Sequence, residues 1–177
     1  MGADIHIFAE TKNKKGKWIK VEKECFSLSK WEVEEFGKKK TESPFDWRSY
    51  SMFGFLADVR NYSCCEPISE PKGLPTDSEY LNELGYYSGT GWGMSNSTKR
   101  EDIYSDGSSH SHSYLTLKEL LEFDYDKTFC DERAETDTHK TIITHRQHLD
   151  GMFFTHLEEL KKLGKPDEVR IVFYFDN

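Results

Sequence analysis

Residues 169–175 read VRIVFYF, and this run decides the fold. It is the strongest strand pattern in the chain, and it is apolar enough to lie at the centre of a sheet. Just before it, residues 145–163 carry an apolar stripe at helical spacing, followed by Gly164 and Pro166 as a stop. The stripe consists of Leu149, Met152, Phe153, His156, Leu157, Leu160 and Leu163. The last third of the chain therefore predicts a helix, with His156 packed in its apolar face, followed by a central strand.

The N-terminus predicts a β-hairpin. Residues 4–10 read DIHIFAE and alternate with period two, so that Asp4, His6 and Phe8 share one face of a strand. Residues 12–17 are polar and turn-rich, and residues 18–22 form a second alternating run. Shorter helices are expected within residues 27–40, 48–61, 78–84 and 117–123, the last opened by a capping box of Thr116 and Glu119.

This order of strands and helices does not alternate as βαβ units would. We therefore expect one α+β domain over residues 1–177, with a mainly antiparallel sheet that includes the N-terminal hairpin and the C-terminal strand. Residues 63–77 are expected to be irregular, and residues 124–140 to be acidic and exposed. Residues 85–109 are rich in Gly, Ser, Thr and Asn. A segment of this length is long for a plain connection, and it therefore predicts a functional loop.

Composition narrows the class of partner. A net charge of −8 over 177 residues is unsuited to general DNA binding, which needs clustered Lys and Arg. The chain has no apolar run long enough for a transmembrane helix, and its start does not resemble a secretory signal. Cys25, Cys64, Cys65 and Cys130 lack the spacing of a disulfide scaffold or a zinc site, so reduced thiols in a cytosol are expected. The net charge does not exclude a small anionic ligand, provided that a few basic side chains lie close together in the fold.

Two short histidine segments are the candidate chemistry. Asp4 and His6 share a strand face, and His110 and His112 in residues 109–114, SHSHSY, would share a face if that segment is extended. One interpretation gathers these four residues as ligands of a zinc or manganese ion. Another is metal-free acid–base chemistry on a phosphodiester by His6, His110 and His112. The structural alternative is a packed His6 beside a sheet and two loop histidines near a helix cap.

Arginine is the expected phosphate ligand, because its fork matches phosphate oxygens. Arg48 and Arg60 are the candidates, and the alternative is that both are surface residues at helix ends. Known histidine signatures are absent. The chain lacks the paired His-x-Thr/Ser units of two-histidine phosphoesterases, and it has Tyr114 where histidine-triad hydrolases have a third alternating histidine. It also has no phosphate-binding P-loop. His145 and His148 could hold a metal by their spacing, but they lack the glutamate of a zincin.

Four blocks of the sequence occur together: MGxDIH at residues 1–6, RSYSMFGFLADVRN at 48–61, PISEPKGLP at 67–75 and SHSHSYLTLKEL at 109–120. In this combination the chain resembles a widespread family of small tailed-phage and prophage accessory proteins. The resemblance covers most of the chain and implies a phage-encoded protein in the host cytoplasm. It implies no established activity, and the link from there to countering host defence is an analogy.

The resulting hypothesis is an accessory, anti-defence protein that recognises a small phosphorylated or cyclic nucleotide and hydrolyses it as a phosphodiesterase. Its cofactor requirement is either none or a divalent metal. The remaining ligand-binding candidates, which supply aromatic stacking or hydroxyls, are Trp92, Ser111, Ser113 and Tyr114. Two alternatives stay open: a non-catalytic sponge that holds the nucleotide in a homo-oligomer, and an inhibitor that binds a host protein through the acidic surface around residues 124–137.

Overall fold

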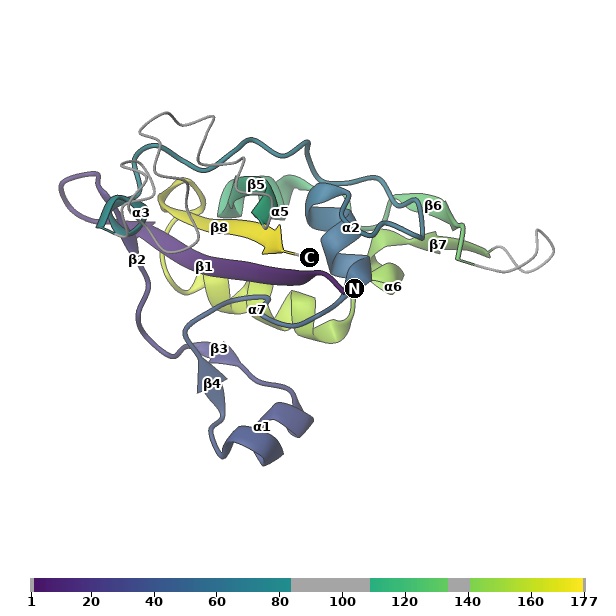
Figure 1. Ribbon diagram of the computed structural model, residues 1–177, viewed down its shortest axis with the longest axis horizontal. Coiled ribbons are helices and arrows are strands. Elements are labelled where there is room, and N and C mark those ends of the chain that lie inside the picture. The colour runs from purple at the N-terminus through teal and green to yellow at the C-terminus, as the bar shows by residue number, and fades with distance from the viewer. Residues whose placement is uncertain (1, 84–108, 134–140, 177) are drawn as a thin grey trace.

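A four-stranded antiparallel sheet forms the centre of the computed structural model, which describes residues 2–83, 109–133 and 141–176 (Figure 1). Its order is β2 (Trp18–Lys20), β1 (Asp4–Lys12), β8 (Val169–Asp176) and β5 (Ser109–Thr116). The predicted α+β class is confirmed, with β1 and β2 as the N-terminal hairpin and β8 between β1 and β5. The predicted functional loop lies outside the described residues, except for Ser109, which begins β5.

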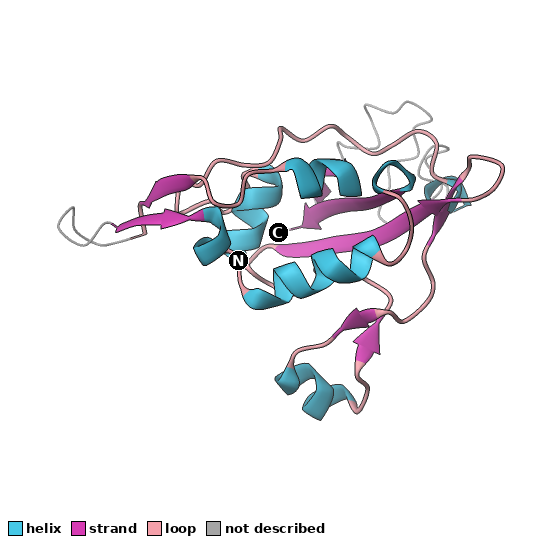
Figure 2. Ribbon diagram, turned by 180° about the vertical axis from the view of Figure 1, so that it is seen from behind, coloured by secondary structure: helices cyan, strands magenta, loops and turns pink. Residues whose placement is uncertain are grey.

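One face of the sheet carries a largely aromatic core. Ile5, Ile7 and Ala9 of β1 and alternate residues of β8 pack against α2 (Tyr50–Ala57), α5 (Leu117–Glu122) and α7 (Gly151–Lys161). In both ribbon views α7 runs along the long strand β1 (Figure 2). Phenylalanines fill this layer, and the fully buried ones are Phe26, Phe45, Phe53, Phe55, Phe153, Phe173 and Phe175. The low aliphatic content of the chain is thus compensated by large aromatic side chains.

The opposite face of the sheet is also covered. Phe8 and Val172 pack against Leu74 and against Leu81 of α3 (Glu79–Glu83). The segment that leads to α3, within residues 63–77, contains no strand or helix, as the sequence predicts. β8 is therefore buried on both faces, which explains its nearly continuous apolar sequence.

A buried ion pair lies within this second layer. Arg170 of β8 donates from Nε to Oε2 of Glu10 at 2.7 Å, and the two residues are 3% and 0% exposed. The guanidinium lies 4.1 Å from the ring centroid of Trp18, and it also donates to Asp77 at 2.8 Å. Ser78 donates a second hydrogen bond to the Glu10 carboxylate. The charges are thus paired and hydrogen-bonded, as burial requires.

The expected capping box of Thr116 and Glu119 is present at α5. The prediction of one helix over residues 145–163 is wrong in one respect, since α6 (His145–His148) ends before α7 begins. Asp150 separates them because its Oδ1 accepts from the Phe153 N–H at 2.9 Å and caps α7. His156 is buried in α7 as predicted, and its Nδ1 accepts from the Phe45 N–H at 2.9 Å.

Two small hairpin-like units stand beside the main sheet. β3 (Phe26–Ser27) pairs with β4 (Lys40–Thr41) around α1 (Lys30–Phe36), and this unit projects from the body in Figure 1. β6 (Thr128–Asp131) lies in the stretch that reads as acidic and exposed, and it pairs with β7 (Thr141–Thr144), which begins just after that stretch. A short 3₁₀ turn, η2 (Pro166–Glu168), precedes β8. Within the described ranges, no helix has the length and apolarity needed to cross a bilayer.

The buried pair leads to a stability prediction. Glu10→Ala leaves Arg170 charged and buried without its main partner, so the free energy of unfolding should fall by about 3–5 kcal/mol. Glu158→Ala is the matched control, because Glu158 pairs with Lys161 on the exposed face of α7 and should cost about 0–1 kcal/mol. Urea denaturation of both variants measures the difference, and equal small losses would contradict a supporting role for the pair.

Candidate functional site

Two of the predicted histidines lie on one face of the sheet. His6 of β1 is opposite Tyr174 of β8, and their rings stack with centroids 4.9 Å apart. His112 of β5 stacks on the other side of Tyr174 at 5.4 Å. His6 Nε2 is also 2.9 Å from Oδ2 of Asp176. The structure thus places His6 and His112 in a row across three strands, with Tyr174 between them.

His110 lies on the opposite face, so the expectation that it shares a face with His112 is wrong. The register of β5 shifts between His110 and Ser113, and Ser111 has a φ of 51°. This bulge breaks the period-two alternation that the expectation assumed. His110 is paired with Phe175 and stacks on its ring, with centroids 6.1 Å apart.

The other candidates on β5 have structural partners. Ser111 Oγ is 3.0 Å from His110 Nδ1, and Ser113 Oγ accepts from the Lys72 N–H at 3.1 Å. The ring of Tyr114 lies 5.1 Å from Lys72 Nζ and 5.5 Å from the Arg170 guanidinium. Trp92 lies outside the described residues, so its predicted stacking role stays a prediction.

Asp4 and Arg48, predicted for different roles, bind each other. Arg48 donates to the two carboxylate oxygens of Asp4 at 2.8 and 2.6 Å, and this contact lowers the pKa of Asp4. With Asp4 on Arg48 and His110 on the core face, the four predicted metal ligands are not gathered. Among the residues that the structure describes, no group of three or more His, Cys, Asp or Glu side chains is arranged to hold a metal ion.

A cleft of about 260 Å³ opens beside His6. Of the three predicted catalytic histidines, only His6 lines it, together with Phe8, Lys20, Asp46, Tyr80 and Tyr174 among others. Burial raises the pKa of the Asp46 carboxyl, and Lys20 already pairs with Glu42 at 3.0 Å. Asp176 adds another carboxylate next to His6. Carboxylates and one paired lysine make this cleft poorly suited to phosphate.

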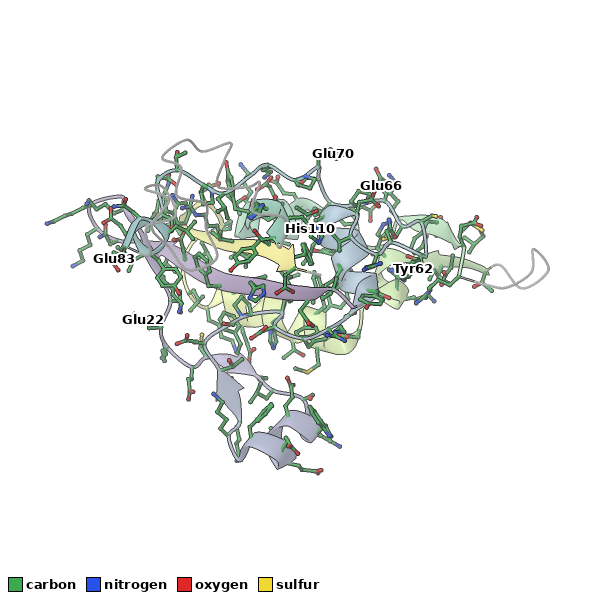
Figure 3. The ribbon with its side chains drawn as sticks, in the orientation of Figure 1. Glu22, Tyr62, Glu66, Glu70, Glu83 and His110 are labelled. Carbon is green, nitrogen blue, oxygen red and sulfur yellow. The ribbon has the colours of Figure 1, made fainter. Side chains whose placement is uncertain are left out.

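A second concave site of about 230 Å³, the α2 pocket, lies at the beginning of α2. Its lining residues are Tyr50, Ser51, Arg60, Tyr62, Ser63 and Arg133. Ser49 caps α2, since its hydroxyl accepts from the Met52 N–H, and Ser51 follows in the first helical turn. Tyr62 lies beside α2 in Figure 3. The pocket combines two guanidinium groups with tyrosine rings and serine hydroxyls. Of the two arginines predicted as phosphate ligands, Arg60 lines this pocket and Arg48 does not.

The loop that carries Arg60 is strained and is held by Asn61. Asp58, Arg60 and Cys64 have positive φ values of 58°, 50° and 55°, which are uncommon for residues with a side chain. The Asn61 amide donates to Asp58 Oδ1 at 2.7 Å and to the Cys65 carbonyl at 2.8 Å. Its Oδ1 accepts from the Ser63 hydroxyl and from the Cys65 N–H, each at 3.1 Å. These bonds fix the backbone on which Arg60, Tyr62 and Ser63 stand.

Gly54 of α2 makes room for this arrangement. A Cβ at Gly54 would lie 2.7 Å from Asn61 Oδ1, which is closer than such contacts occur. The close approach of loop and helix therefore depends on the missing side chain at this position.

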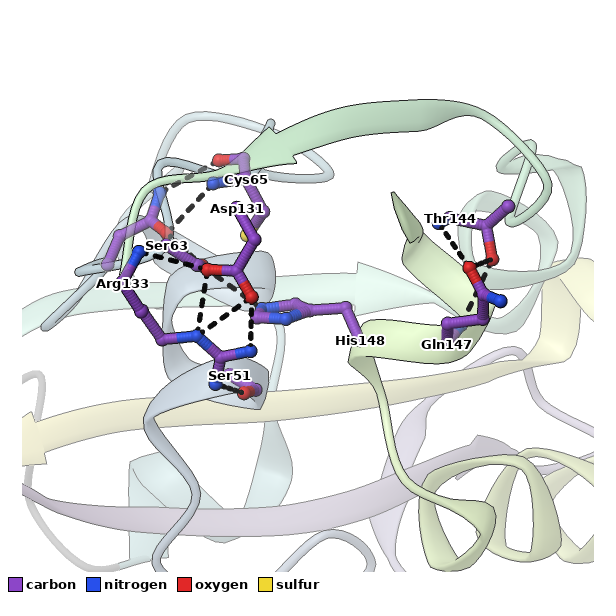
Figure 4. Close-up of polar contacts among 9 residues, drawn as sticks. Ser51, Ser63, Cys65, Asp131, Arg133, Thr144, Gln147 and His148 are labelled. Carbon is purple, nitrogen blue, oxygen red and sulfur yellow. Dashed lines mark hydrogen bonds and ion pairs between the residues drawn. The ribbon is translucent and has the colours of Figure 1, made fainter. Parts of the chain in front are cut away.

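Arg133 enters the α2 pocket from the end of β6 (Figure 4). Its guanidinium forms a bidentate pair with Asp131, with Nε–Oδ1 at 2.9 Å and Nη2–Oδ2 at 2.5 Å, and Nη1 donates to Ser51 Oγ at 3.4 Å. The contact with Arg133 lowers the pKa of Asp131. Sequence reasoning missed Arg133, because it lies in a stretch that reads as acidic and exposed.

His148 lies behind the pocket and contacts Ser63. Its Nε2 is 3.2 Å from Ser63 Oγ, and Nδ1 is buried without a hydrogen bond of standard geometry in the described part of the chain. Burial, and then the charge of Arg133, lower the pKa of His148 to about 4, while the Ser51 backbone acts in the opposite direction. No carboxylate of the described residues forms a hydrogen bond with Nδ1, so among these residues the pair has no third member of a catalytic triad. Ser63 and His148 therefore support the pocket wall.

His145, the other histidine of α6, is also structural. Its Nδ1 lies 2.9 Å from the Lys127 carbonyl oxygen and its Nε2 3.1 Å from the Glu66 carbonyl oxygen, and the side chain is buried. With both ring nitrogens facing backbone carbonyls, it is not placed to share a metal with His148.

Comparison of the chain with protein-family models, curated proteins and solved structures finds no match.

The depressed pKa of His148 leads to a prediction on pH and stability. In the unfolded chain this histidine takes up a proton near its ordinary pKa of 6.5, whereas in the folded protein it does so only near 4. The free energy of unfolding should therefore decrease as the pH falls from 6.5 towards 4, by about 2–3 kcal/mol from this group. Chemical denaturation at pH 7, 6, 5 and 4.5 measures it. His148→Gln should flatten that slope, and an unchanged slope would show that His148 does not titrate in this way.

Proposed function

We propose that this protein binds a small phosphorylated ligand of the nucleotide class in the α2 pocket. The observation that carries the proposal is the presence of two arginines, Arg60 and Arg133, on one pocket at the N-terminal turn of α2. Guanidinium groups recognise phosphate through two parallel hydrogen bonds. A helix N-terminus adds partial positive charge and unpaired N–H groups to the same place.

The geometry around Arg133 supports this interpretation. Asp131 holds one edge of the guanidinium, through Nε and Nη2, and fixes its orientation, while Nη1 faces Ser51 of α2. The hydroxyls of Ser51 and Ser63 line the same pocket and can donate to phosphate oxygens. A preorganised arginine loses less conformational freedom on binding than a free one.

The tyrosines support a nucleotide rather than phosphate alone. Tyr50 and Tyr62 lie with ring centroids 5.9 Å apart and an interplanar angle of 70°, and Tyr62 is 57% exposed. An exposed tyrosine ring next to a phosphate site offers a stacking surface that any base can use. Because Arg60 is on the same strained loop as Tyr62, phosphate and base contacts would be coupled through one backbone segment.

The proposal is for binding, with chemistry as a separate question. His6, His110 and His112 do not line the α2 pocket, and only His6 lines the cleft beside it, so the predicted catalytic role of three histidines has no common ligand site in either place. The lining of the α2 pocket favours a sponge, which binds a nucleotide signal without cleaving it, over a phosphodiesterase. Such a sponge would act for a phage, in the cytoplasm of the host. That setting rests on the family resemblance of the sequence alone.

Calorimetric titration with phosphate, adenosine, AMP and 3′,5′-cyclic AMP tests the proposal. We expect the phosphorylated ligands to bind and adenosine to bind much more weakly. Arg60→Ala and Arg133→Ala should each weaken binding by about 10- to 100-fold, because each removes a charge-assisted contact. Arg146→Ala is the matched control, since Arg146 pairs with Asp126 and does not line the pocket.

Chromatography of the bound nucleotide after denaturation separates binding from turnover. Recovery of the intact ligand supports the sponge, and a new product that persists in Arg133→Ala would direct attention to the histidine cleft. If no phosphorylated ligand binds, or if the arginine variants bind as the wild type does, the α2 pocket is not a phosphate site.

A further inference from the structure

The tryptophan cleft, a third concave site of about 240 Å³, lies between α1 and the beginning of α7. Its lining residues are Ser29, Trp31, Glu32, Trp47, Asp150 and Met152. Trp31 is 66% exposed, and α1, on which it stands, has no buried residue. Exposed apolar side chains that lie together beside a cavity indicate an interaction site, whereas single apolar residues scattered over a surface do not.

The two tryptophans are positioned by different parts of the fold. Trp31 stands on α1, whose beginning is fixed by a capping box of Ser29 and Glu32. Trp47 packs with its edge against His156 of α7, with ring centroids 5.1 Å apart, and is therefore anchored to the core. One side of the cleft is thus part of the projecting unit, and the other is part of the main body.

Two carboxylates complete the lining, and both are held in place by helix caps. Glu32 Oε2 accepts from the Ser29 N–H at 2.8 Å, and Asp150 Oδ1 accepts from the Phe153 N–H at 2.9 Å. Over the described residues, neither carboxylate forms an ion pair with Lys, Arg or His. No Lys, Arg or His of residues 2–83, 109–133 and 141–176 lines the cleft, so its described lining combines aromatic faces with negative charges alone.

We propose that the tryptophan cleft binds the guanidinium of an arginine side chain presented by a partner protein. Tryptophan faces attract cations through the ring quadrupole, and a planar guanidinium both stacks on the ring and donates to carboxylates. An ammonium is more strongly hydrated and matches this flat, bidentate chemistry less well. The net charge of −8 adds long-range attraction for a basic surface.

The surroundings favour a polypeptide over a small free cation. Phe36 is 58% exposed and contacts Trp31 edge-on, with ring centroids 6.2 Å apart. It lines an adjoining groove of about 380 Å³ with Leu28, Glu32, Lys38, Thr41 and Asp46. Glu32 is shared by both concavities, so a chain that seats an arginine in the cleft would also cover the adjoining groove and its exposed Phe36. A small cation would leave that groove exposed.

The test uses fluorescence anisotropy with a labelled peptide that carries one arginine between apolar residues. The same peptide with citrulline at that position is the control ligand, because the urea is nearly isosteric and uncharged. We expect the arginine peptide to bind at least ten-fold more tightly than the citrulline peptide. Trp31→Ala and Glu32→Gln should each weaken the arginine peptide at least five-fold, and Gln at position 32 still supports a capping box.

Glu34→Gln is the matched protein control, since Glu34 is exposed on α1 and does not line the cleft; its affinity should stay within two-fold of wild type. Equal binding of the two peptides, or unchanged affinity in the Trp31 and Glu32 variants, would overturn the proposal. N-acetylarginine amide is a further competitor, because it carries the guanidinium without a peptide around it. If it displaces the labelled peptide at the concentration at which unlabelled peptide does, the partner is a small guanidinium ligand and the proposed polypeptide partner is wrong. Circular dichroism of each variant excludes loss of fold as the cause.

Discussion

Burial of both faces of β8 is the constraint on which the rest of the structure depends. A strand in this position needs a second layer on each side, and the chain supplies an aromatic layer on one side and the segment around Leu74 and Leu81 on the other. The ion pair of Glu10 and Arg170 fits this arrangement because the two residues are direct partners in the β1–β8 register. A slip of β8 by one residue would turn Arg170 towards the aromatic core and away from Glu10, so the pair also specifies the register.

The same constraint positions the concave sites. α2 is held to the sheet by Phe53, whose ring contacts Phe175 of β8 edge-on at 5.0 Å. The strained loop after α2 then returns along the helix, which only Gly54 permits. The α2 pocket and the tryptophan cleft therefore stand on elements anchored in one aromatic layer, whereas the cleft at His6 opens on the other side of the sheet. The lining residues of the three sites differ in charge. The α2 pocket has two guanidinium groups, the tryptophan cleft has two tryptophans and two carboxylates, and the cleft at His6 has a mixed, mainly acidic polar lining.

Local patterns in the sequence predicted the elements whose character is set by their own residues. The alternation of β1, the apolar run of β8, the stripe of α7 and the capping box of α5 all depend on neighbours within a few positions. The break at Asp150 was not predicted, because the apolar stripe continues across it from Leu149 to Met152. β6 and β7 were missed, because their residues carry little apolar pattern and pair only with each other.

The site was less predictable, since it depends on contacts between distant segments. Arg48 and Arg60 have similar sequence settings, yet Arg48 binds Asp4 while Arg60 joins the α2 pocket. Nothing local to Arg133 or Ser63 indicates that they meet. The separation of His110 from His112 follows from a bulge, and a bulge at a serine with positive φ leaves no reliable mark in one sequence.

That bulge has a consequence for the free edge of the sheet. β5 is an outer strand, and an unbroken outer strand offers its backbone to any other extended chain. Here the register shift interrupts the ladder, and the Gly73 N–H binds the His112 carbonyl at 2.8 Å from outside. The border formed by β5 is thus a poor template for strand addition, which protects an aromatic, strongly β-forming sequence against aggregation at this edge.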